Sequence, residues 1–433
     1  MKTVDEHISD ILESVAVLPA RRLPLAAAHG CALATDVRAT IALPGFDNSA
    51  MDGYAVRAAD VEQASAQTPV RLPVTGEIAA GAAGPAPVAP GTAARIMTGA
   101  PVPPGADAII QVEWTDGGTE TVAVHQPARR GLHIRRAGED VTPGSLVLPA
   151  GVVLGSAQIG LLAAINVARP PVRPRPRVAV LSTGSELVEV GKVVGPGQIV
   201  DSNSHAVSAA AREAGCEVRR LTGVPDDPAQ FEAALRAVLP EVDAVVTTGG
   251  VSVGAHDVVK EVLTATGEVR FERVAMQPGQ PQGFGVIDGV AVFTLPGNPV
   301  SALVSFELFV RPALRKMRGF TGPGRPSQVV TVAERLTSPP AKRSFLRVRV
   351  DRDTDGGLVA HSAGGQGSHH LSAAASANAL LVVPEAVTVV EPGDQLTAIL
   401  LTAEPADGIL AGLAVDAAPA TVASAVPALE ANV

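Results

Sequence analysis

Residues 243–267 read DAVVTTGGVSVGAHDVVKEVLTATG, a strand pattern that runs through a glycine-rich loop into a helix pattern. The uninterrupted apolar run at its start is typical of a strand buried on both faces. Strand and helix patterns alternate on both sides of this stretch. Such alternation predicts a parallel sheet with helices on both faces.

The neighbouring segments continue this pattern. Asp227 is placed to cap a helix whose first residue is Pro228, a residue suited to that position. We expect strands in VAVLSTG (178–184), VRRLTGV (218–224) and AVFTLPG (291–297), and helices in SHAVSAAAREAG (204–215), DPAQFEAALRAVL (227–239) and PVSALVSFELFVRPALRKM (299–317).

Proline-rich stretches bound this α/β region. ARPPVRPRPR (168–177) is typical of an extended linker, and TGPGRP (321–326) marks a second boundary. The fold class that we predict is multidomain α/β plus β. Its parts are a split helical domain (1–40 and 144–172), a β-rich inserted domain (41–143), the central parallel-sheet α/β domain (173–322), a C-terminal β domain (323–404) and a disordered tail (405–433).

The composition excludes several classes of protein. The 433 residues are 46% hydrophobic and 18% charged, and the net charge of −9 argues against a general binder of nucleic acid or of anionic membranes. Cys31 and Cys216 are the only cysteines, so the sequence has no disulfide framework. The first residues lack the apolar core of a secretory signal, and we expect a cytoplasmic protein without a membrane span.

Four loops carry the residues suited to chemistry, because ligands bind at the carboxyl ends of parallel strands. Each loop follows a predicted strand. Carboxylates and glycine N–H groups at one edge would suit Mg²⁺ together with a phosphate. The residues concerned are Glu186, Asp226 and Asp257, with Gly249, Gly250, Ser252, Gly297, Asn298 and Ser301.

Each of these residues also has a structural interpretation. Asp257 fits a helix N-cap, Asp226 fits stabilisation of a helix start, and Gly297 with Asn298 fits a simple turn. The sequence lacks a P-loop motif and lacks a GxGxxG after the first strand, which argues against a P-loop nucleotidase and a dinucleotide dehydrogenase. The combination of three carboxylates and two glycine-rich loops at one sheet edge favours a binding site for a cation and a phosphate over these structural interpretations.

The stretch NSAMDGYAV (48–56) lies outside the α/β region and contains the only tyrosine of the chain, Tyr54. Asp52 precedes Gly53, and Asp-Gly is a strong turn signal because glycine accepts positive φ. A turn that presents the Asp52 carboxylate is the interpretation of these residues taken alone.

Six motifs together resemble the bacterial molybdopterin molybdenumtransferase (MoeA) family, which is related to the E domain of gephyrin. The resemblance covers residues 5 to 400. The motifs, in chain order, are NSAMDGYAV, RIMTGAPVPPGADAII, IRRAGEDV, VLSTGSEL, TTGGVSVG and LPGNPVSALVSFE.

This resemblance implies a homodimer that acts on adenylylated molybdopterin and molybdate, with Mg²⁺ as cofactor and release of AMP. It also implies contacts with other proteins of the cofactor pathway. Asp52 and Thr98 match residues that complete the site of the other subunit, and Glu186, Asp226 and Asp257 match acids associated with metal and substrate. Further matches are Asp140, Ser182, Thr183 and Gly184 for substrate, and Pro281, Ser301, Arg343 and Ser368 for molybdate.

One segment departs from the family pattern. The family has Lys-Pro-Gly-Lys-Pro where this chain has Gln277, Pro278, Gly279, Gln280 and Pro281. Glutamine donates hydrogen bonds without charge, which puts about 1–2 kcal/mol of oxyanion binding per site in question. Arg273 and Arg343 are candidates to compensate. The alternatives are that the protein works slowly, needs high molybdate or prefers another oxyanion such as tungstate.

Two other functions stay open on the sequence. A non-catalytic molybdopterin-binding or scaffold protein would retain the fold, although it has no need of Asp52, Glu186, Asp226 and Asp257 together. An adenylyltransferase that makes the activated pterin is suggested by the central sheet alone. The flanking domains favour the insertion enzyme over it.

Overall fold

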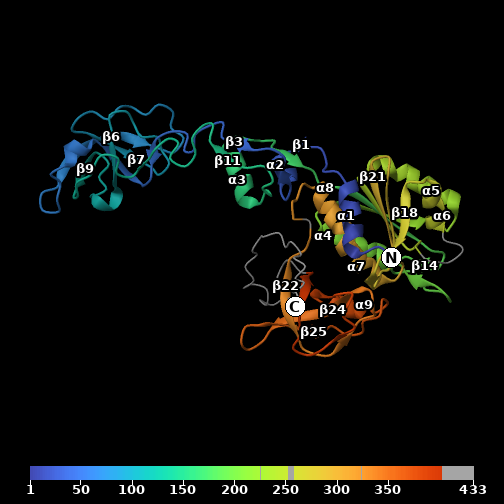
Figure 1. Cartoon of the computed structure of the whole chain (residues 1–433). Coiled ribbons are helices and arrows are strands. Elements are labelled where there is room, and N and C mark those ends of the chain that lie inside the picture. Colours follow the sequence, from blue (N-terminus) through green and yellow to red (C-terminus); the bar gives the residue numbers. More distant parts are fainter. Residues whose placement is uncertain (225, 252–257, 323, 402–433) are drawn as a thin grey trace, which may run out of the picture. The chain divides into compact units, whose positions relative to one another are not determined.

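The computed structural model describes residues 1–224, 226–251, 258–322 and 324–401, which form two compact units (Figure 1). One unit comprises Met1–Ala20 and the chain from Arg173 onward, and the other comprises Arg21–Val172. The disorder that we expect for the tail, residues 405–433, concerns a segment outside the described residues.

A six-stranded sheet forms the centre of the first unit, in the order β16-β13-β17-β21-β20-β18. Four neighbouring strands are parallel, as the alternation predicts, whereas β20 pairs antiparallel both with β21 and with the edge strand β18. Asp288 and Gly289, both with positive φ, make the two-residue turn between β20 and β21. The strands are β13 (Arg177–Thr183), β16 (Glu217–Val224), β17 (Ala244–Thr248), β18 (Val269–Arg273), β20 (Pro281–Ile287) and β21 (Val290–Leu295).

Helices cover both faces of this sheet. Alternate residues of β13 and β17 point into two separate cores, with Val180 and Val246 on one face and Leu181 and Val245 on the other. Helices α5 (Pro228–Val238) and α6 (Val258–Ala265) pack on the second face. The first face is covered by α1 (Val4–Ser14), α4 (Asn203–Glu213), α7 (Pro299–Ser305), η4 (Phe306–Val310) and α8 (Arg311–Met317).

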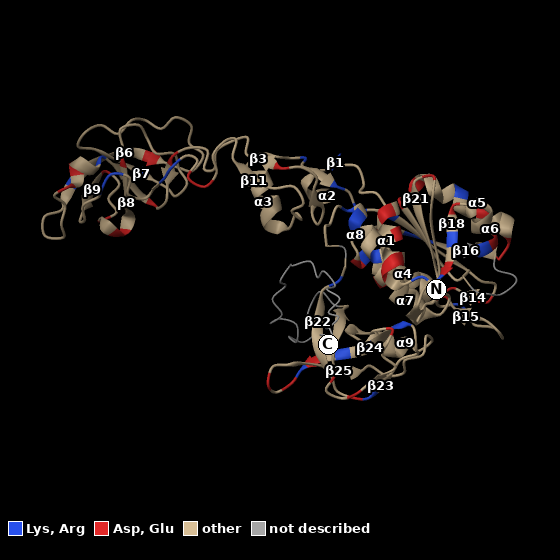
Figure 2. Cartoon of the chain, in the orientation of Figure 1, with Lys and Arg blue, Asp and Glu red and all other residues tan. Residues whose placement is uncertain are grey.

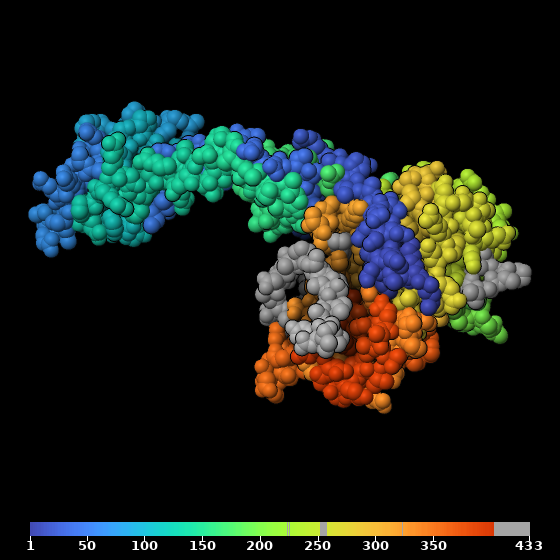
Figure 3. Space-filling model, viewed as in Figure 1, coloured from blue at the N-terminus to red at the C-terminus, as the bar shows by residue number. Residues whose placement is uncertain are grey.

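The position of α1 differs from our assignment of residues 1–40 to the split helical domain. Helix α1 starts at a capping box between Thr3 and Glu6 and buries Val4 and Ile11 against α8, η4 and β20 (Figure 3). Helix α1 belongs to this unit because of its apolar side chains. The apolar stripe of α1 fills a face of the central sheet, so the split domain begins near Arg21.

The closing helix of the α/β domain contains one irregular turn. We expect a continuous helix over 299–317, and the structure has a π-helical turn, η4, between α7 and α8. Pro312 follows that turn. Proline lacks the N–H for the regular i to i−4 bond, and its ring crowds the carbonyl four residues earlier, which favours a local change of hydrogen bonding.

A β barrel follows in the same unit. Strands β24-β25-β22-β28-β26 pair in that order, and a further pairing of β24 with β26 closes the ring around one apolar core. The two-residue strand β19 (Met276–Gln277) adds to β24 from outside the barrel. The barrel strands are β22 (Ser327–Val332), β24 (Arg343–Arg352), β25 (Leu358–Ser362), β26 (Ala379–Val383) and β28 (Gln395–Leu400). The pair β23 (Leu336–Thr337) and β27 (Val389–Val390) and helix α9 (Leu371–Ser376) accompany them.

The second unit contains a five-stranded sheet in the order β8-β5-β7-β6-β9, with an apolar core on each face. Its strands are β5 (Gly53–Val56), β6 (Val70–Ile78), β7 (Ala93–Ile96), β8 (Ala108–Gln111) and β9 (Thr121–Val124), with the turns η1 (Ala58–Val61) and η2 (Val112–Trp114). This sheet corresponds to the predicted β insertion.

The chain on either side of this insertion shares a single core. That core contains Leu33 and Val37 from one flank and Leu154 and Leu162 from the other. The flanks hold α2 (Leu25–Ala28), α3 (Ser156–Ala164), the sheet β1-β12-β2 (Arg21–Arg22, Pro171–Arg173 and Ala32–Leu33) and the pair β3 (Val37–Arg38) with β11 (Leu146–Leu148). The pair β4 (Asn48–Ser49) and β10 (Ile134–Arg135) lies beside the insertion.

Acidic and basic residues are both found along the ribbon of each unit (Figure 2). Among the described residues, the helices are too short or too polar to span a membrane. The central parallel sheet, the split domain around the β insertion and the C-terminal barrel together confirm the predicted fold class.

Candidate active site

The first loop of the site follows β13 at the carboxyl edge of the sheet. Gly184 has φ +152°, and a Cβ there would lie 2.7 Å from each carboxylate oxygen of Glu186. The glycine therefore makes room for the Glu186 side chain, which folds back over it. Glu186 is exposed, as a carboxylate that meets a ligand must be.

Asp226 joins this loop from the neighbouring strand β16. Its Oδ2 accepts a hydrogen bond from the backbone N–H of Ser185 at 3.0 Å. Glu186 and Asp226 are thus brought together at one sheet edge, as the strand order predicts. The following residue, Asp227, has a different task, because its Oδ1 accepts from the N–H of Gln230 at 2.9 Å and caps α5.

The glycine loop after β17 lies beside it. Gly249 and Gly250 both have φ near +85°, a backbone conformation that favours glycine. A Cβ on Gly249 would lie 3.7 Å from the carbonyl oxygen of Thr183, so this loop runs close to the first one. Ser252 and Asp257, the other predicted site residues of this loop, lie outside the described residues.

The loop before α7 connects the sheet edge to the barrel. Gly297 approaches Gly249, with 3.7 Å from its Cβ position to the Gly249 Cα. The side chain of Asn298 donates from Nδ2 to the Ser368 Oγ at 2.9 Å, and the N–H of Val300 donates to the Ser368 carbonyl at 3.1 Å. The structure therefore brings Asn298 and Ser368 together across two domains of one unit. Ser301 is buried on α7.

Arg347 is a residue of this region that our sequence reasoning missed. It lies in β24 and is 1% exposed, and burial lowers the pKa of its guanidinium to about 10. Its Nη2 donates to the carbonyls of Gly365 and Gly367 at 3.3 Å, which fixes the loop that carries Ser368. No ion pair of Arg347 with an acidic side chain occurs in the described part of the chain. A buried cation with carbonyl partners fits a place where an anion approaches.

Arg343 is arranged differently from what its predicted role requires. Its guanidinium donates to both carboxylate oxygens of Asp5 at 2.7 and 2.8 Å and to Glu385 at 3.0 Å. The hydrogen bonds to Asp5 raise the pKa of Arg343 most, and Glu385 raises it further. Two acids hold this charge, so Arg343 would have to leave Asp5 to bind an oxyanion through its Nη atoms.

The glutamine segment lies at the end of β18. Arg273 donates from Nη2 to Gln280 Oε1 at 3.2 Å, so one of the two candidate cations is beside the position of the second family lysine. Pro281 pairs with Arg273 in the register of β20 and β18. Gln277 pairs with Ser344 through β19.

Asp52 and Thr98 lie together in the other unit. The N–H of Thr98 donates to Asp52 Oδ1 at 2.6 Å, and this hydrogen bond lowers the pKa of Asp52. The next residue, Gly53, has to be glycine because a Cβ at this position would collide with the carbonyl oxygen of Ile110 in β8. The expected Asp-Gly turn with positive φ is not formed, because Gly53 is the first residue of β5 and has no positive φ. A bend at Asp52 presents the exposed carboxylate instead. Asp140 is also exposed in this unit.

The donor set at the sheet edge consists of oxygen atoms. In the described residues, no group of three or more His, Cys, Asp or Glu could hold a metal ion, and Asp257 is outside them. Glu186 and Asp226 supply two neighbouring carboxylates, the ligand type that Mg²⁺ prefers. These residues fit a hard divalent cation.

A parallel sheet with acidic and glycine-rich loops at its carboxyl edge defines a class of α/β proteins that bind phosphate-bearing ligands. Family models then identify the family. The MoeA N-terminal region (domains I and II) matches residues 2–166, the probable molybdopterin binding domain matches 179–316, and the MoeA C-terminal region (domain IV) matches 329–401.

Named relatives agree with the family models. Molybdopterin molybdenumtransferase 2 of Mycobacterium tuberculosis is 48% identical over 402 residues, which cover 92% of this chain and 98% of the relative. The Haemophilus influenzae molybdopterin molybdenumtransferase is 38% identical with the same coverage. A solved MoeA structure from Pyrococcus horikoshii has a TM-score of 0.76 at 32% identity and covers 93% of this chain and 99% of its own. The chain belongs to the MoeA family and is a transferase of molybdenum cofactor biosynthesis.

Proposed function

We propose that this protein is a molybdopterin molybdenumtransferase. It takes adenylylated molybdopterin and molybdate, cleaves the phosphoanhydride, inserts molybdenum between the dithiolene sulfurs and releases AMP. The observation that carries this proposal is the sheet edge that holds Glu186, Asp226, Gly249 and Asn298, of which Asn298 is bonded to Ser368 beside the barrel. One end of that edge suits a phosphoanhydride, and the other suits an oxyanion.

The phosphate half relies on backbone N–H groups and carboxylates. The glycine loops at Gly184 and Gly249 would cradle phosphate oxygens, with Ser182 and Thr183 at the adjoining strand end. Glu186, Asp226 and Asp257 would hold Mg²⁺, which supplies positive charge to the phosphoanhydride when bound. The exposed position of Glu186 and Asp226 supports this assignment.

The oxyanion half is assigned to the Ser368 loop. The Ser368 hydroxyl can donate to molybdate while it accepts from Asn298, and Arg347 supplies a buried positive charge behind the loop. Pro281, Ser301 and Arg343 contribute in our proposal to the surroundings of the oxyanion. Charged donors favour molybdate and tungstate alike, so the preference between them is a matter for measurement.

The proposal includes a homodimer with a composite site. Asp52 and Thr98 of one subunit complete the site of the other, because a two-fold interface presents the same pair of surfaces twice. We further propose that the protein acts in the cytoplasm beside other proteins of the cofactor pathway.

Release of AMP from adenylylated molybdopterin tests the function. We expect release that requires both molybdate and Mg²⁺ with the purified full-length chain. A protein that binds adenylylated molybdopterin and releases no AMP under any of these conditions would instead be a non-catalytic binding or scaffold protein.

A further inference from the structure

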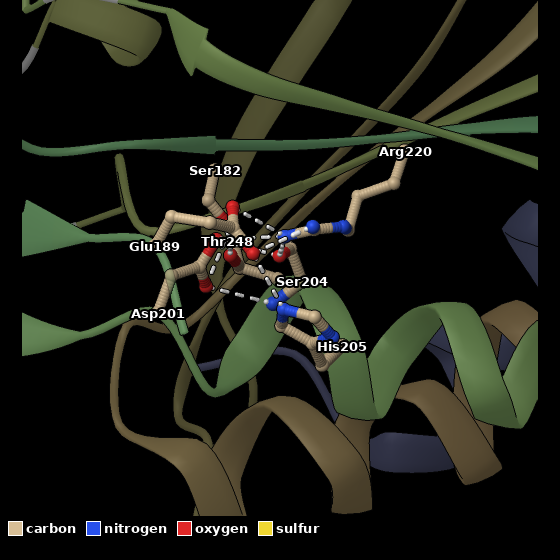
Figure 4. A network of polar contacts seen from close by, with 7 residues as sticks. All are labelled: Ser182, Glu189, Asp201, Ser204, His205, Arg220 and Thr248. Atoms are coloured by element: carbon tan, nitrogen blue, oxygen red, sulfur yellow. Dashed lines mark hydrogen bonds and ion pairs between the residues drawn. The ribbon is translucent and has the colours of Figure 1, made fainter. Parts of the chain in front are cut away.

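A corner of the chain between β15 (Ile199–Val200) and α4 lies next to Ser182 and Thr248, at the ends of β13 and β17 (Figure 4). Asp201 is 7% exposed and is the centre of this corner. Its Oδ1 accepts from the Ser204 N–H at 3.0 Å, and its Oδ2 accepts from the Ser204 Oγ at 2.5 Å. The carboxylate is therefore fixed by two donors from one residue.

Asp201 reaches the ends of two strands through one hydroxyl. The Ser182 Oγ lies 3.3 Å from Asp201 Oδ1 and 2.8 Å from the Thr248 Oγ1. Ser182 has one hydroxyl proton, so when it donates to Asp201 the proton between the two hydroxyls comes from Thr248. Ser182 and Thr248 are partners in the parallel register, and the two loops of the phosphate half follow them.

The backbone of the same segment holds the acidic loop. The N–H of Ile199 donates to the Glu186 carbonyl at 2.8 Å, and the N–H of Asp201 donates to the Val188 carbonyl at 2.9 Å. These bonds form part of the short parallel pairing between β14 (Leu187–Val188) and β15. The backbone of Glu186 is thus tied to the corner as well.

Asn203 connects the corner to the oxyanion half. Its Nδ2 donates to the Gly297 carbonyl at 2.6 Å. The next residue, Asn298, donates to Ser368, whose loop is bonded to Arg347. Hydrogen bonds, joined by the backbone from Asn203 to Ser204 and from Gly297 to Asn298, therefore connect the ends of β13 and β17 to the barrel.

Arg220 braces the corner from the side. It donates from Nη1 to the Ser204 Oγ at 3.1 Å and binds both oxygens of Glu189 at 3.0 and 2.7 Å. The hydrogen bonds from Arg220, and then from His205, lower the pKa of Glu189 to about 2. Arg220 thus bonds Glu189 and Ser204 at the same time.

We propose that Asp201, Asn203 and Ser204 are positioning residues that set the two halves of the site in register. Asp201 and Ser204 fix the strand ends that carry the phosphate loops, and Asn203 fixes the loop that meets Ser368. The inference rests on the proposed function for its kinetic consequence, and on the hydrogen bonds alone for its structural one.

The kinetic test compares two buried serines of α4. Ser204→Ala removes the bond to Asp201, and Ser208→Ala is the matched control because the Ser208 Oγ has no hydrogen-bond partner among the described residues. We expect Ser204→Ala to lower kcat/KM for adenylylated molybdopterin about 10-fold. Ser204→Thr should restore most of it, and Ser208→Ala should stay within about 2-fold of wild type.

The structural test measures backbone hydrogen exchange in the ligand-free protein. Asn203→Ala should speed exchange in residues 364–370, and Ser204→Ala should speed it in residues 183–189. Ser208→Ala should change neither. Equal exchange in all variants, or a Ser204→Ala enzyme as active as Ser208→Ala, would overturn the positioning role. If wild type releases no AMP, the proposed function fails and exchange still decides the positioning role.

Discussion

At the scale of single residues, Asp226 and Asp227 are adjacent acids with different tasks. Asp226 faces the acidic loop through Ser185, and Asp227 caps α5. Asp226→Asn and Glu186→Gln should each lower AMP release by at least about 100-fold. The thermal midpoint should change little, because exposed loop carboxylates contribute little to stability.

Asp227→Asn is the matched control, since asparagine caps helices as well as aspartate does. It should keep near-normal activity. AMP release within a few-fold of wild type in Asp226→Asn would remove Asp226 from the site.

The two glutamines should respond differently to a restored charge. Gln280 already accepts a hydrogen bond from Arg273 at 3.2 Å, so a lysine at 280 would face a like charge. Gln277→Lys should therefore lower the KM for molybdate, with a smaller effect at high salt, and Gln280→Lys should lower it less or not at all. The two KM values, measured at low and high salt, test this. An equal decrease in KM from both variants would show that Arg273 does not oppose a positive charge at position 280.

Arg347 shows why part of the site could not be predicted from the sequence. Arg347 and Arg349 are two residues apart in β24, so they share a face of the strand, and one is buried while the other is exposed. A period of two cannot separate them. The difference arises from the glycine-rich loop that covers Arg347, which is a tertiary feature. Asp201 was missed because its contact with Ser182 of β13 is likewise formed only in the folded chain.

At the scale of elements, helix α1 carries a buried titratable group. His7 is 3% exposed, and its ring meets that of Phe309 edge-on with 4.7 Å between the ring centroids. Its Nδ1 lies 3.4 Å from Glu272 Oε2, and Glu272 also binds Lys2. Burial lowers the pKa of His7 to about 4 from its usual 6.5. Between these two values the unfolded chain binds a proton at His7 that the native protein does not.

Stability should therefore fall as the pH decreases from 6.5 to 4, by up to about 3 kcal/mol from this residue. His7→Asn removes the titration, so its thermal midpoint should depend less steeply on pH over this range. Midpoints measured at several pH values for both proteins test the prediction. Parallel curves would mean that His7 does not contribute.

Two glycines of the five-stranded sheet make a matched pair for β5. A Cβ at Gly53 would collide with the Ile110 carbonyl, whereas a Cβ at Gly76 in β6 would meet nothing within 4 Å. Gly53→Ala should destabilise the protein by about 2–3 kcal/mol, and Gly76→Ala should be neutral within about 1 kcal/mol. Denaturant unfolding of both variants measures this. If Gly53→Ala destabilises the protein as little as Gly76→Ala, the close approach of β5 and β8 relaxes easily.

The elements themselves were largely predictable, and their partners less so. The cap at Asp227 and the strand–helix alternation identified α5 and the parallel strands, because those signals are local. Asp288-Gly289 is an equally local hairpin signal, and it accounts for the antiparallel pairing of β20 with β21 that the alternation did not predict. The position of α1 was not predictable, since its apolar stripe fits any apolar face.

At the scale of the whole molecule, our proposal assigns site residues to both units. Asp52 and Thr98 belong to residues 21–172, whereas Glu186 and Asp226 belong to the other unit. The carboxylates of Asp52, Glu186 and Asp226 are all exposed, so neither unit uses them to stabilise its own core. In a two-fold dimer, a residue of one subunit can complete the site of the other.

Mixed dimers test this arrangement. Asp52→Asn and Glu186→Gln should each be inactive alone and should complement each other when co-expressed, because each hybrid dimer has one site free of both changes. With random exchange about half of the dimers are hybrids, so activity should recover to about a quarter of wild type. A mixture of the two purified variants without subunit exchange is the control and should stay inactive. If hybrids confirmed by differential tags release no AMP, Asp52 serves its own subunit or only forms the bend.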